Sequence, residues 1–233
     1  KDNWAFDIEG MKKAAADHNG FSIVYFVNPN NPTGTITPAD LIEPWIKSKP
    51  ADTLFIVDEA YAEFVNDSQY RSVEPLIKAG VDNVILLKTF SKIYAMAGMR
   101  VGYAVADEKV IKRISGYVAG EKLNYAGVCA ALVSVDDHAF IDYSKKSTDT
   151  ARAIFVDALA ELGLDYLPSH GNFVFHKVKG DLDTFQKRMA DANILVGRAF
   201  PPATGWCWTS LGTPEEMAFV AQTLRQFRQK GWL

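Results

Sequence analysis

The chain has 233 residues, of which 48% are hydrophobic and 23% charged, an ordinary composition for a globular protein with a sizeable core. Its net charge of −3 argues against a general affinity for nucleic acid or anionic membranes, and no apolar run is long enough to span a bilayer. The two cysteines, Cys129 and Cys207, and the four scattered histidines lack metal-ligand spacing, so we expect reduced, buried thiols and no metal site.

Residues 1–118 predict helices that alternate with buried strands. The strands are short, largely apolar runs bounded by turn residues, expected over residues 21–27, 53–57, 83–87 and 100–106. The helices are expected over residues 6–19, 38–48, 73–79 and 107–118. Pro38 suits the first helical position behind a Thr37 cap. This alternation predicts an α/β fold with a mostly parallel sheet sandwiched by helices.

After residue 125 the pattern changes to a smaller α+β domain, with a long helix as the bridge. Helices are expected over residues 126–135, 140–162, 182–192 and 213–230. Strands are expected over residues 172–178 and 194–196, and an extended segment lies around 206–211. The last helix begins with a capping box that runs from Thr213 to Glu216, with Pro214 in its first turn.

Three polar clusters follow the ends of predicted strands. They are Asn28–Gly34, Asp58–Tyr61 and Thr89–Lys92. Ligand groups of an open α/β sheet lie on loops beyond the carboxyl ends of its strands, so we expect the three clusters to converge on one edge. An amide, a carboxylate with a phenol, and a lysine would then form an active site.

Within the stretch from Lys88 to Tyr103, the loop between the two predicted strands carries Thr89, Ser91, Lys92 and Arg100 interleaved with apolar residues. Buried charge is costly unless it is paired, and no carboxylate lies within this stretch. A phosphate would satisfy the hydroxyls of Thr89 and Ser91 and the guanidinium of Arg100, leaving Lys92 free for chemistry. The plain alternative is that these cations are surface residues of an amphipathic loop.

Three ordered motifs carry a family resemblance: NPNNPTG, DEAY, and TFSK followed eight residues later by the arginine of MRVGY. In this order they resemble a fold-type-I pyridoxal 5'-phosphate (PLP) aminotransferase of class I/II, of the histidinol-phosphate type. The segments SHGNFVF and LGTPEEM match the C-terminal domain of the same group. The resemblance implies that residues 1–125 are the C-terminal part of the large PLP-binding domain, and that residues 126–233 are linking helices and the small C-terminal domain.

The resemblance implies a catalytic role for Lys92, Asp58 and Tyr61. Lys92 would bond to the cofactor aldehyde and, once released, would move a proton at the substrate Cα. Asp58 would keep the pyridine nitrogen protonated, because an opposite charge favours the charged form. Tyr61 and Asn31 would donate hydrogen bonds to the phenolic oxygen of the cofactor.

The resemblance also assigns the phosphate of PLP to Thr89, Ser91 and Arg100. The turn of the NPNNPTG segment would be shaped by Asn28, Pro29 and Asn30, and Gly34 would supply backbone freedom. Taken without the resemblance, an aspartate at a strand end such as Asp58 is more often a turn or cap former. The plain alternatives for Tyr61 and Asn31 are a core tyrosine and a turn asparagine.

Two departures from the family stand out. Members have an earlier glycine/serine turn over the phosphate and an aromatic residue on the ring, but this chain opens on Lys1 and has only 27 residues before Asn28. We therefore expect the C-terminal part of a longer polypeptide, and weak PLP binding by these 233 residues alone.

The second departure is Trp208, which stands where relatives have an arginine for the substrate's carboxylate or phosphate. An indole cannot replace a bidentate cation. Either Arg198 takes the anion, or Trp206 and Trp208 form an apolar wall for an aromatic or amine substrate; an ordinary strand with one outward tryptophan is the plain alternative. Asn172, in the SHGNFVF segment, completes the candidate substrate-binding residues.

The resemblance implies an aminotransferase that moves an amino group from an amino acid or amino-alcohol phosphate to a 2-oxo acid by a ping-pong route. Relatives are homodimers with the active site at the subunit interface, so we expect a homodimer, without nucleic-acid or membrane partners. We expect it in the cytoplasm, and an export signal upstream stays open. Two alternatives remain open: a decarboxylase or lyase resembling threonine-phosphate decarboxylases, and a non-catalytic PLP-binding regulatory protein.

Overall fold

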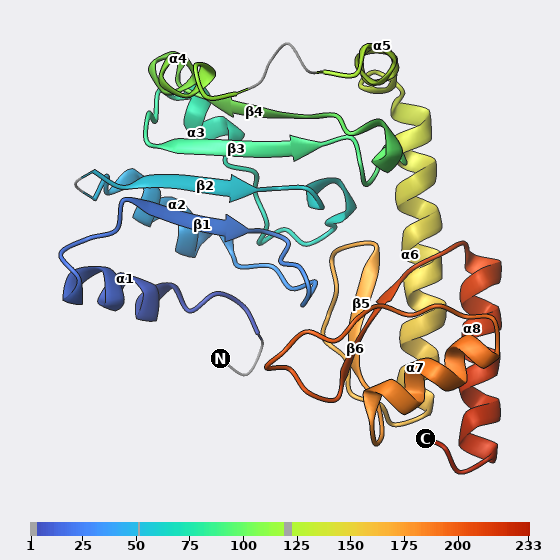
Figure 1. Ribbon diagram of the computed structural model, residues 1–233. Helices are drawn as coiled ribbons and strands as arrows, with labels where there is room; N and C mark the ends of the chain where they lie inside the picture. Colours follow the sequence, from blue (N-terminus) through green and yellow to red (C-terminus); the bar gives the residue numbers. More distant parts are fainter. Residues whose placement is uncertain (1–3, 51, 119–122) are drawn as a thin grey trace. The chain divides into compact units, whose positions relative to one another are not determined.

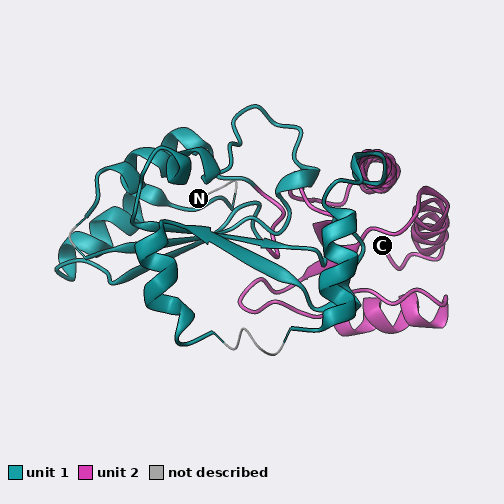
Figure 2. Ribbon diagram, turned by 90° about the horizontal axis from the view of Figure 1, so that it is seen from above, with its two compact units in different colours: residues 1–30, 36–141 teal, residues 31–35, 142–233 magenta. Residues whose placement is uncertain are grey.

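The computed structural model describes residues 4–50, 52–118 and 123–233 and divides into two compact units. Unit 1 comprises residues 1–30 and 36–141, and unit 2 comprises residues 31–35 and 142–233 (Figure 2). Helix α6 (His138–Glu161) carries the chain from unit 1 into unit 2. The expected domain boundary after residue 125 stays a prediction.

Unit 1 is built on a four-stranded sheet with the order β1-β2-β3-β4 (Figure 1). Its strands are β1 (Ile23–Val27), β2 (Leu54–Asp58), β3 (Val84–Thr89) and β4 (Gly102–Ala106). β1, β2 and β3 run parallel, whereas β4 runs antiparallel to β3. The predicted α/β class with a mostly parallel sheet flanked by helices is confirmed.

One face of this sheet packs against helices α1 (Ile8–Asp17), α2 (Ala39–Lys47) and α3 (Glu74–Lys78). Figure 1 shows α2 and α3 on the same side of the strands. Their shared core contains Val24, Phe26, Phe55, Val57, Val84 and Leu86 from the strands, and Ile8, Ile42, Trp45, Ile46 and Leu76 from the helices. Successive strand residues point to opposite faces, so Ile23 and Tyr25 lie on the other face, where they are 57% and 49% exposed.

The remaining elements of unit 1 are the 3₁₀ helices η1 (Ala62–Phe64) and η2 (Ala97–Met99) and the helices α4 (Glu108–Ser115) and α5 (Tyr125–Ser134). The prediction that the strand after Arg100 is buried was wrong, because β4 is the outer strand of the described sheet and its residues 102–104 are exposed. Cys129, on α5, is also exposed rather than buried, whereas Cys207 is buried as expected.

The start of α2 differs from the prediction. Pro38 is the N-cap residue rather than the first helical residue, and Thr37 does not cap the helix. The reason is that the Thr37 hydroxyl accepts the N–H of Phe6 at 3.2 Å, while its backbone N–H donates to the side chain of Asn28 at 2.9 Å. Thr37 is therefore bonded to two other chain segments, and its hydroxyl does not cap α2.

Unit 2 combines a two-stranded antiparallel sheet with three helices. Besides α6 it contains β5 (Phe173–Lys177), α7 (Leu182–Asp191), β6 (Trp206–Ser210) and α8 (Pro214–Gln229). Its core gathers Phe155, Leu159, Val174, Phe185, Cys207, Leu224 and Phe227. The predicted capping box of α8 is confirmed, because Glu216 N–H donates to Thr213 Oγ1 and Thr213 N–H donates to Glu216 Oε2.

The short strand predicted over residues 194–196 was wrong, because the segment is irregular. It lies beside β6 through one backbone hydrogen bond, from Gly197 N–H to the carbonyl of Trp208 at 2.8 Å. The carbonyl of Gly197 accepts instead from the side chain of Gln186, so no ladder forms there.

Over the described ranges, no helix has both the length and the apolar character needed to cross a membrane. Among the same residues, no cluster of three or more histidine, cysteine, aspartate or glutamate side chains could hold a metal ion.

His176 on β5 is a buried core histidine. Its Nε2 lies 3.0 Å from Thr209 Oγ1, and its ring meets Phe155 and Phe185 edge-on. Burial lowers the pKa of His176 from 6.5 to about 4, against the opposing effect of the Lys177 carbonyl. The imidazole is therefore neutral in the folded protein at neutral pH.

This burial predicts a loss of stability in mild acid. Because the folded-state pKa lies below the unfolded one, the unfolded chain takes up the proton first, and stability falls from about pH 6.5 down to pH 4. Between pH 7 and pH 5, His176 should cost about 2 kcal/mol of the free energy of unfolding, measured with urea. The non-titrating variant His176→Leu should show a smaller loss over this interval. An equal loss in both proteins would contradict the assignment.

Candidate active site

Asp58, the last residue of β2, has hydrogen bonds to both carboxylate oxygens. Its Oδ1 accepts the N–H of Ala60 at 3.0 Å, and its Oδ2 accepts the hydroxyl of Tyr25 at 2.9 Å. Tyr25 pairs with Ile56 across β1 and β2, so strand alternation places it on the same face as Asp58. Partial burial, with the hydrogen bond to Asp58 and its charge, raises the pKa of Tyr25 to about 12. The phenol therefore remains a donor at neutral pH.

The loop after β3 is closed by backbone hydrogen bonds. Phe90 N–H donates to the carbonyl of Val101 at 3.1 Å, and Met96 N–H donates to the carbonyl of Phe90 at 3.1 Å. Thr89 Oγ1 accepts the N–H of Ser91 at 3.0 Å, which sets both hydroxyl-bearing residues in one turn. The aromatic ring of Phe90 is buried beneath this turn and anchors it.

Lys92 and Tyr61 lie next to each other in unit 1. The Nζ of Lys92 is 5.1 Å from the centre of the Tyr61 ring, within the range of a cation–π contact. Tyr61 is 4% exposed and immediately precedes η1, whereas Lys92 is half-buried on the loop after β3. Two residues from separate motifs thus meet as the sequence predicted.

Arg100, the residue that follows η2, bonds to the same loop. Its backbone has φ +54°, in the left-handed region that is uncommon for a residue with a side chain. Its Nη1 donates to the carbonyl of Ala97 at 2.7 Å and to Ser91 Oγ at 3.4 Å. The guanidinium and the Ser91 hydroxyl therefore stand side by side, with further donors on the exposed guanidinium.

These groups line one open cavity of about 340 Å³. The lining residues are Asp58, Ala60, Leu87, Lys88, Thr89, Ser91, Lys92, Ala97 and Arg100. The structure thus brings five predicted site residues to one hollow at the carboxyl ends of β2 and β3. A larger cavity of about 780 Å³ lies at the amino ends of β1 and β2, and none of the predicted site residues lines it.

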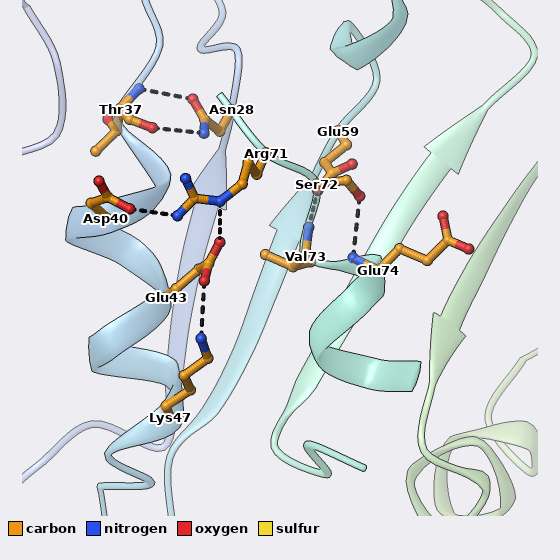
Figure 3. A network of polar contacts seen from close by, with 10 residues as sticks. All are labelled: Asn28, Thr37, Asp40, Glu43, Lys47, Glu59, Arg71, Ser72, Val73 and Glu74. Atoms are coloured by element: carbon orange, nitrogen blue, oxygen red, sulfur yellow. Dashed lines mark hydrogen bonds and ion pairs between the residues drawn. The ribbon is translucent and has the colours of Figure 1, made fainter. Parts of the chain in front are cut away.

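A buried ion cluster lies behind this cavity. Glu59 is 1% exposed; its Oε1 accepts the N–H of Val73 at 2.8 Å (Figure 3), and its Oε2 lies 3.4 Å from Lys88 Nζ. Lys88 Nζ also donates to Glu63 Oε1 at 2.9 Å. Burial by itself would lower the pKa of Lys88, but the charges of Glu63 and Glu59 outweigh it and raise that pKa. Lys88 therefore stays charged and joins the segment after Tyr61 to β3.

The NPNNPTG segment is braced at its first residue. Asn28 is 3% exposed and donates from Nδ2 to the Thr37 carbonyl at 3.0 Å, while its Oδ1 accepts the N–H of Thr37 (Figure 3). Asn31 is an exposed turn residue in the part of this segment that belongs to unit 2. Within unit 2, Gly34 has φ +74°, and a Cβ there would lie 2.9 Å from Ser169 Cα. The predicted need for backbone freedom at Gly34 is thus confirmed.

The candidate substrate residues Arg198, Trp208 and Asn172 all belong to unit 2. Trp208 packs on Phe173, with ring centres 5.2 Å apart, and its indole Nε1 is buried without a hydrogen-bond partner among the described residues. The exposed guanidinium of Arg198 lies 4.7 Å from the centre of the Phe200 ring. Asn172 directly precedes β5, and its carbonyl accepts the N–H of Leu211.

Sequence reasoning missed Tyr25 and the cluster of Glu59, Lys88 and Glu63. Tyr25 sits in an apolar strand and is 33 residues away from its partner Asp58. Lys88 is 25 residues from Glu63. The one usable signal was a charged residue at the end of an otherwise apolar strand, because a buried charge requires a counter-charge.

The ion cluster predicts that replacing Lys88 strongly lowers the stability of the fold. Lys88→Met should lower the free energy of unfolding by about 3 kcal/mol, because the Glu59 carboxylate would remain buried without its counter-charge. Lys88→Arg keeps the charge and should retain most of the stability. Adding Glu59→Gln to Lys88→Met should restore part of the loss in urea unfolding. Wild-type stability of Lys88→Met would show that the pair does not stabilise the fold.

The family of the chain follows from comparison with known proteins. The family described as aminotransferase class I and II matches residues 1–224. The histidinol-phosphate aminotransferase of Brevibacillus brevis is 34% identical over 224 residues, which are 94% of this chain and 60% of that protein. Histidinol-phosphate aminotransferase 1 of Cupriavidus pinatubonensis is 33% identical over 233 residues, 97% of this chain and 61% of that protein. The chain thus spans about 60% of the length of these curated relatives.

Two solved structures are similar throughout the chain. A protein from Erwinia carotovora atroseptica SCRI1043, provisionally named a histidinol-phosphate aminotransferase, is 66% identical, with a TM-score of 0.97 over 100% of this chain and 67% of its own. The histidinol-phosphate aminotransferase of Sinorhizobium meliloti, solved in complex with pyridoxal-5'-phosphate, is 28% identical, with a TM-score of 0.85 over 96% of this chain and 62% of its own. On this evidence the chain belongs to the aminotransferase class I and II family.

Proposed function

We propose that the full-length protein is a PLP-dependent aminotransferase of the histidinol-phosphate type. It would move an amino group from an amino acid or an amino-alcohol phosphate to a 2-oxo acid. The observation that carries this proposal is the single cavity of unit 1 that Asp58, Ser91, Lys92 and Arg100 line together. Membership of the family and the PLP complex of the S. meliloti relative support the same conclusion.

The donor set of the cavity fits PLP. Arg100 Nη1 lies 3.4 Å from Ser91 Oγ. Together with Thr89, these residues offer a guanidinium and two hydroxyls, which are groups that bind a phosphate. Asp58 offers a carboxylate for the ring nitrogen, and Lys92 offers an amine for the aldehyde. The guanidinium of Arg100 is exposed and could pair with a phosphate at this point, whereas Lys88 is already paired with Glu59 and Glu63.

When bound, PLP supplies an aldehyde that captures amines and a ring that accepts the electron pair left when a bond at Cα breaks. Asp58 then holds the proton on the ring nitrogen by its opposite charge, which keeps the ring a good electron acceptor. Lys92 would move a proton between the substrate Cα and the aldehyde carbon of the cofactor. When Lys92 carries that proton, its ammonium group lies over the face of the Tyr61 ring, a favourable cation–π contact. The family resemblance would also give the hydroxyl of Tyr61 and the amide of Asn31 a role as donors to the phenolic oxygen of the cofactor.

Substrate selection is assigned to unit 2. Arg198 uses none of its guanidinium donors in a described hydrogen bond or ion pair, which suits it to bind a substrate carboxylate or phosphate. Trp208, with Trp206 and Phe200 in one apolar cluster, supplies a wall for an aromatic or amine group, and Asn172 lies at the start of the neighbouring strand. The expected homodimer and the expected cytoplasmic location belong to the same proposal.

Lys92→Ala tests the proposal directly. The full-length protein mixed with PLP should develop a visible absorption band that borohydride removes, and Lys92→Ala should lack this band. Amino transfer should fall about a thousandfold, the usual size of a lost acid–base group. Lys112→Ala replaces an exposed lysine outside the cavity and is the control; it should show the wild-type band and the wild-type rate of amino transfer.

The products separate the alternatives to transfer. Formation of pyridoxamine phosphate from an amino donor supports an aminotransferase, whereas release of CO₂ supports a decarboxylase. A normal band with neither product indicates a regulatory PLP-binding protein. A borohydride-sensitive band that persists in Lys92→Ala would contradict the assignment of this lysine.

Trp208→Arg tests the substrate wall. The variant should lower the KM for carboxylate-bearing donors by about tenfold, because a bidentate arginine–carboxylate pair replaces an indole. It should raise the KM for aromatic amines, which lose the apolar surface. Trp208→Phe is the matched control and should keep the wild-type order of donors. An unchanged donor panel in Trp208→Arg would place Trp208 outside the substrate site.

A further inference from the structure

Tyr25 lies outside every motif of the family resemblance, yet its hydroxyl binds the carboxylate that faces the candidate cavity. The bond from Tyr25 Oη to Asp58 Oδ2 measures 2.9 Å and joins two adjacent strands. The parallel register pairs Val27 with Asp58 and Tyr25 with Ile56, so the tyrosine lies on the same face as the aspartate and two residues before it along the strands. This register fixes the direction from which the hydroxyl reaches the carboxylate.

The carboxylate of Asp58 is thereby oriented from two sides. The N–H of Ala60 holds Oδ1 at 3.0 Å, and the phenol holds Oδ2. Free rotation about the last side-chain bond of an aspartate would otherwise let either oxygen face the cavity at any angle. An ionised carboxylate can accept about four hydrogen bonds, so two bonds leave room for a third donor from a ligand.

We propose that Tyr25 is a positioning residue that orients the Asp58 carboxylate toward the protonated ring nitrogen of PLP. This inference rests on the proposed function, because it assumes that PLP occupies the cavity. Tyr25 does not touch the reacting atoms and acts through Asp58. It suits this task because partial burial and then the neighbouring Asp58 carboxylate raise its pKa to about 12, so the hydroxyl remains a donor at neutral pH.

The proposal predicts which property of the bound cofactor depends on Tyr25. A misaligned Asp58 would hold the proton on the ring nitrogen less well, and the ring would then withdraw less electron density. The Lys92 nitrogen joined to the cofactor should therefore keep its proton to higher pH. The midpoint of the pH titration of the visible band should therefore rise, and PLP affinity should fall by the value of about one hydrogen bond, roughly fivefold.

Tyr25→Phe removes only the hydroxyl and keeps the ring on the sheet. In the full-length protein, this variant should show both a higher midpoint of the visible band and about fivefold weaker PLP binding by spectroscopic titration. Tyr117→Phe is the matched control: Tyr117 is 93% exposed, and the change should alter neither value. Circular dichroism melting should show that Tyr25→Phe retains the wild-type fold.

A double-mutant cycle with Asp58→Asn decides whether Tyr25 acts through Asp58. In the Asp58→Asn background, Tyr25→Phe should produce no further shift of the midpoint, because the carboxylate that it orients is gone. Equal shifts in both backgrounds, or a wild-type midpoint in Tyr25→Phe, would overturn the inference while leaving the proposed function intact. Absence of any PLP band in the wild-type protein would overturn both.

Discussion

The parallel ladder that joins β1, β2 and β3 at their carboxyl ends is the constraint on which the site depends. Its hydrogen bonds continue one residue beyond the strands: Asn28 N–H donates to the carbonyl of Asp58 at 2.9 Å, and Glu59 N–H donates to the carbonyl of Leu87 at 3.0 Å. The first residue of one motif is thus bonded to the first residue of the next. Because a register slip of one residue would turn Asp58 to the other face, the ladder also decides which side chain meets the cavity.

The alternation of strand residues separates the groups assigned to chemistry from those that stabilise the fold. Asp58 points to the face of Tyr25 and the cavity, whereas the next residue, Glu59, is buried with Lys88 on the opposite side. A carboxylate offered to a ligand and a carboxylate paired with a lysine therefore occupy successive positions. This arrangement ties the segment after β2 to β3 without using the carboxylate of Asp58 or the amine of Lys92.

The sequence was sufficient to predict a mostly parallel α/β sheet and the convergence of Asp58, Lys92 and Arg100. Both follow from local pattern, because apolar runs mark the strands and polar residues mark their ends. Contacts between strands were not predictable in this way. The partnership of Tyr25 with Asp58 depends on strand register, which is set by the whole sheet.

Two local misassignments have similar causes. The apolar residues 194–196 fit a strand or a packed loop equally well, and the bond from Gln186 to the Gly197 carbonyl decided for the loop. The strand after Arg100 was expected to be buried because its sequence is apolar, but its place at the edge of the described sheet exposes residues 102–104. In the first case the deciding hydrogen bond comes from the preceding helix α7, and in the second no further strand of the described sheet lies beside β4.

The most direct measurement is a crystal structure of the full-length protein grown with PLP. The account predicts electron density continuous from Lys92 Nζ to the cofactor, with Asp58 Oδ2 or Oδ1 about 3 Å from the ring nitrogen. The phosphate should lie against Ser91 and Arg100. Density that joins PLP to another lysine, or a ring nitrogen that faces away from Asp58, would contradict the central claim.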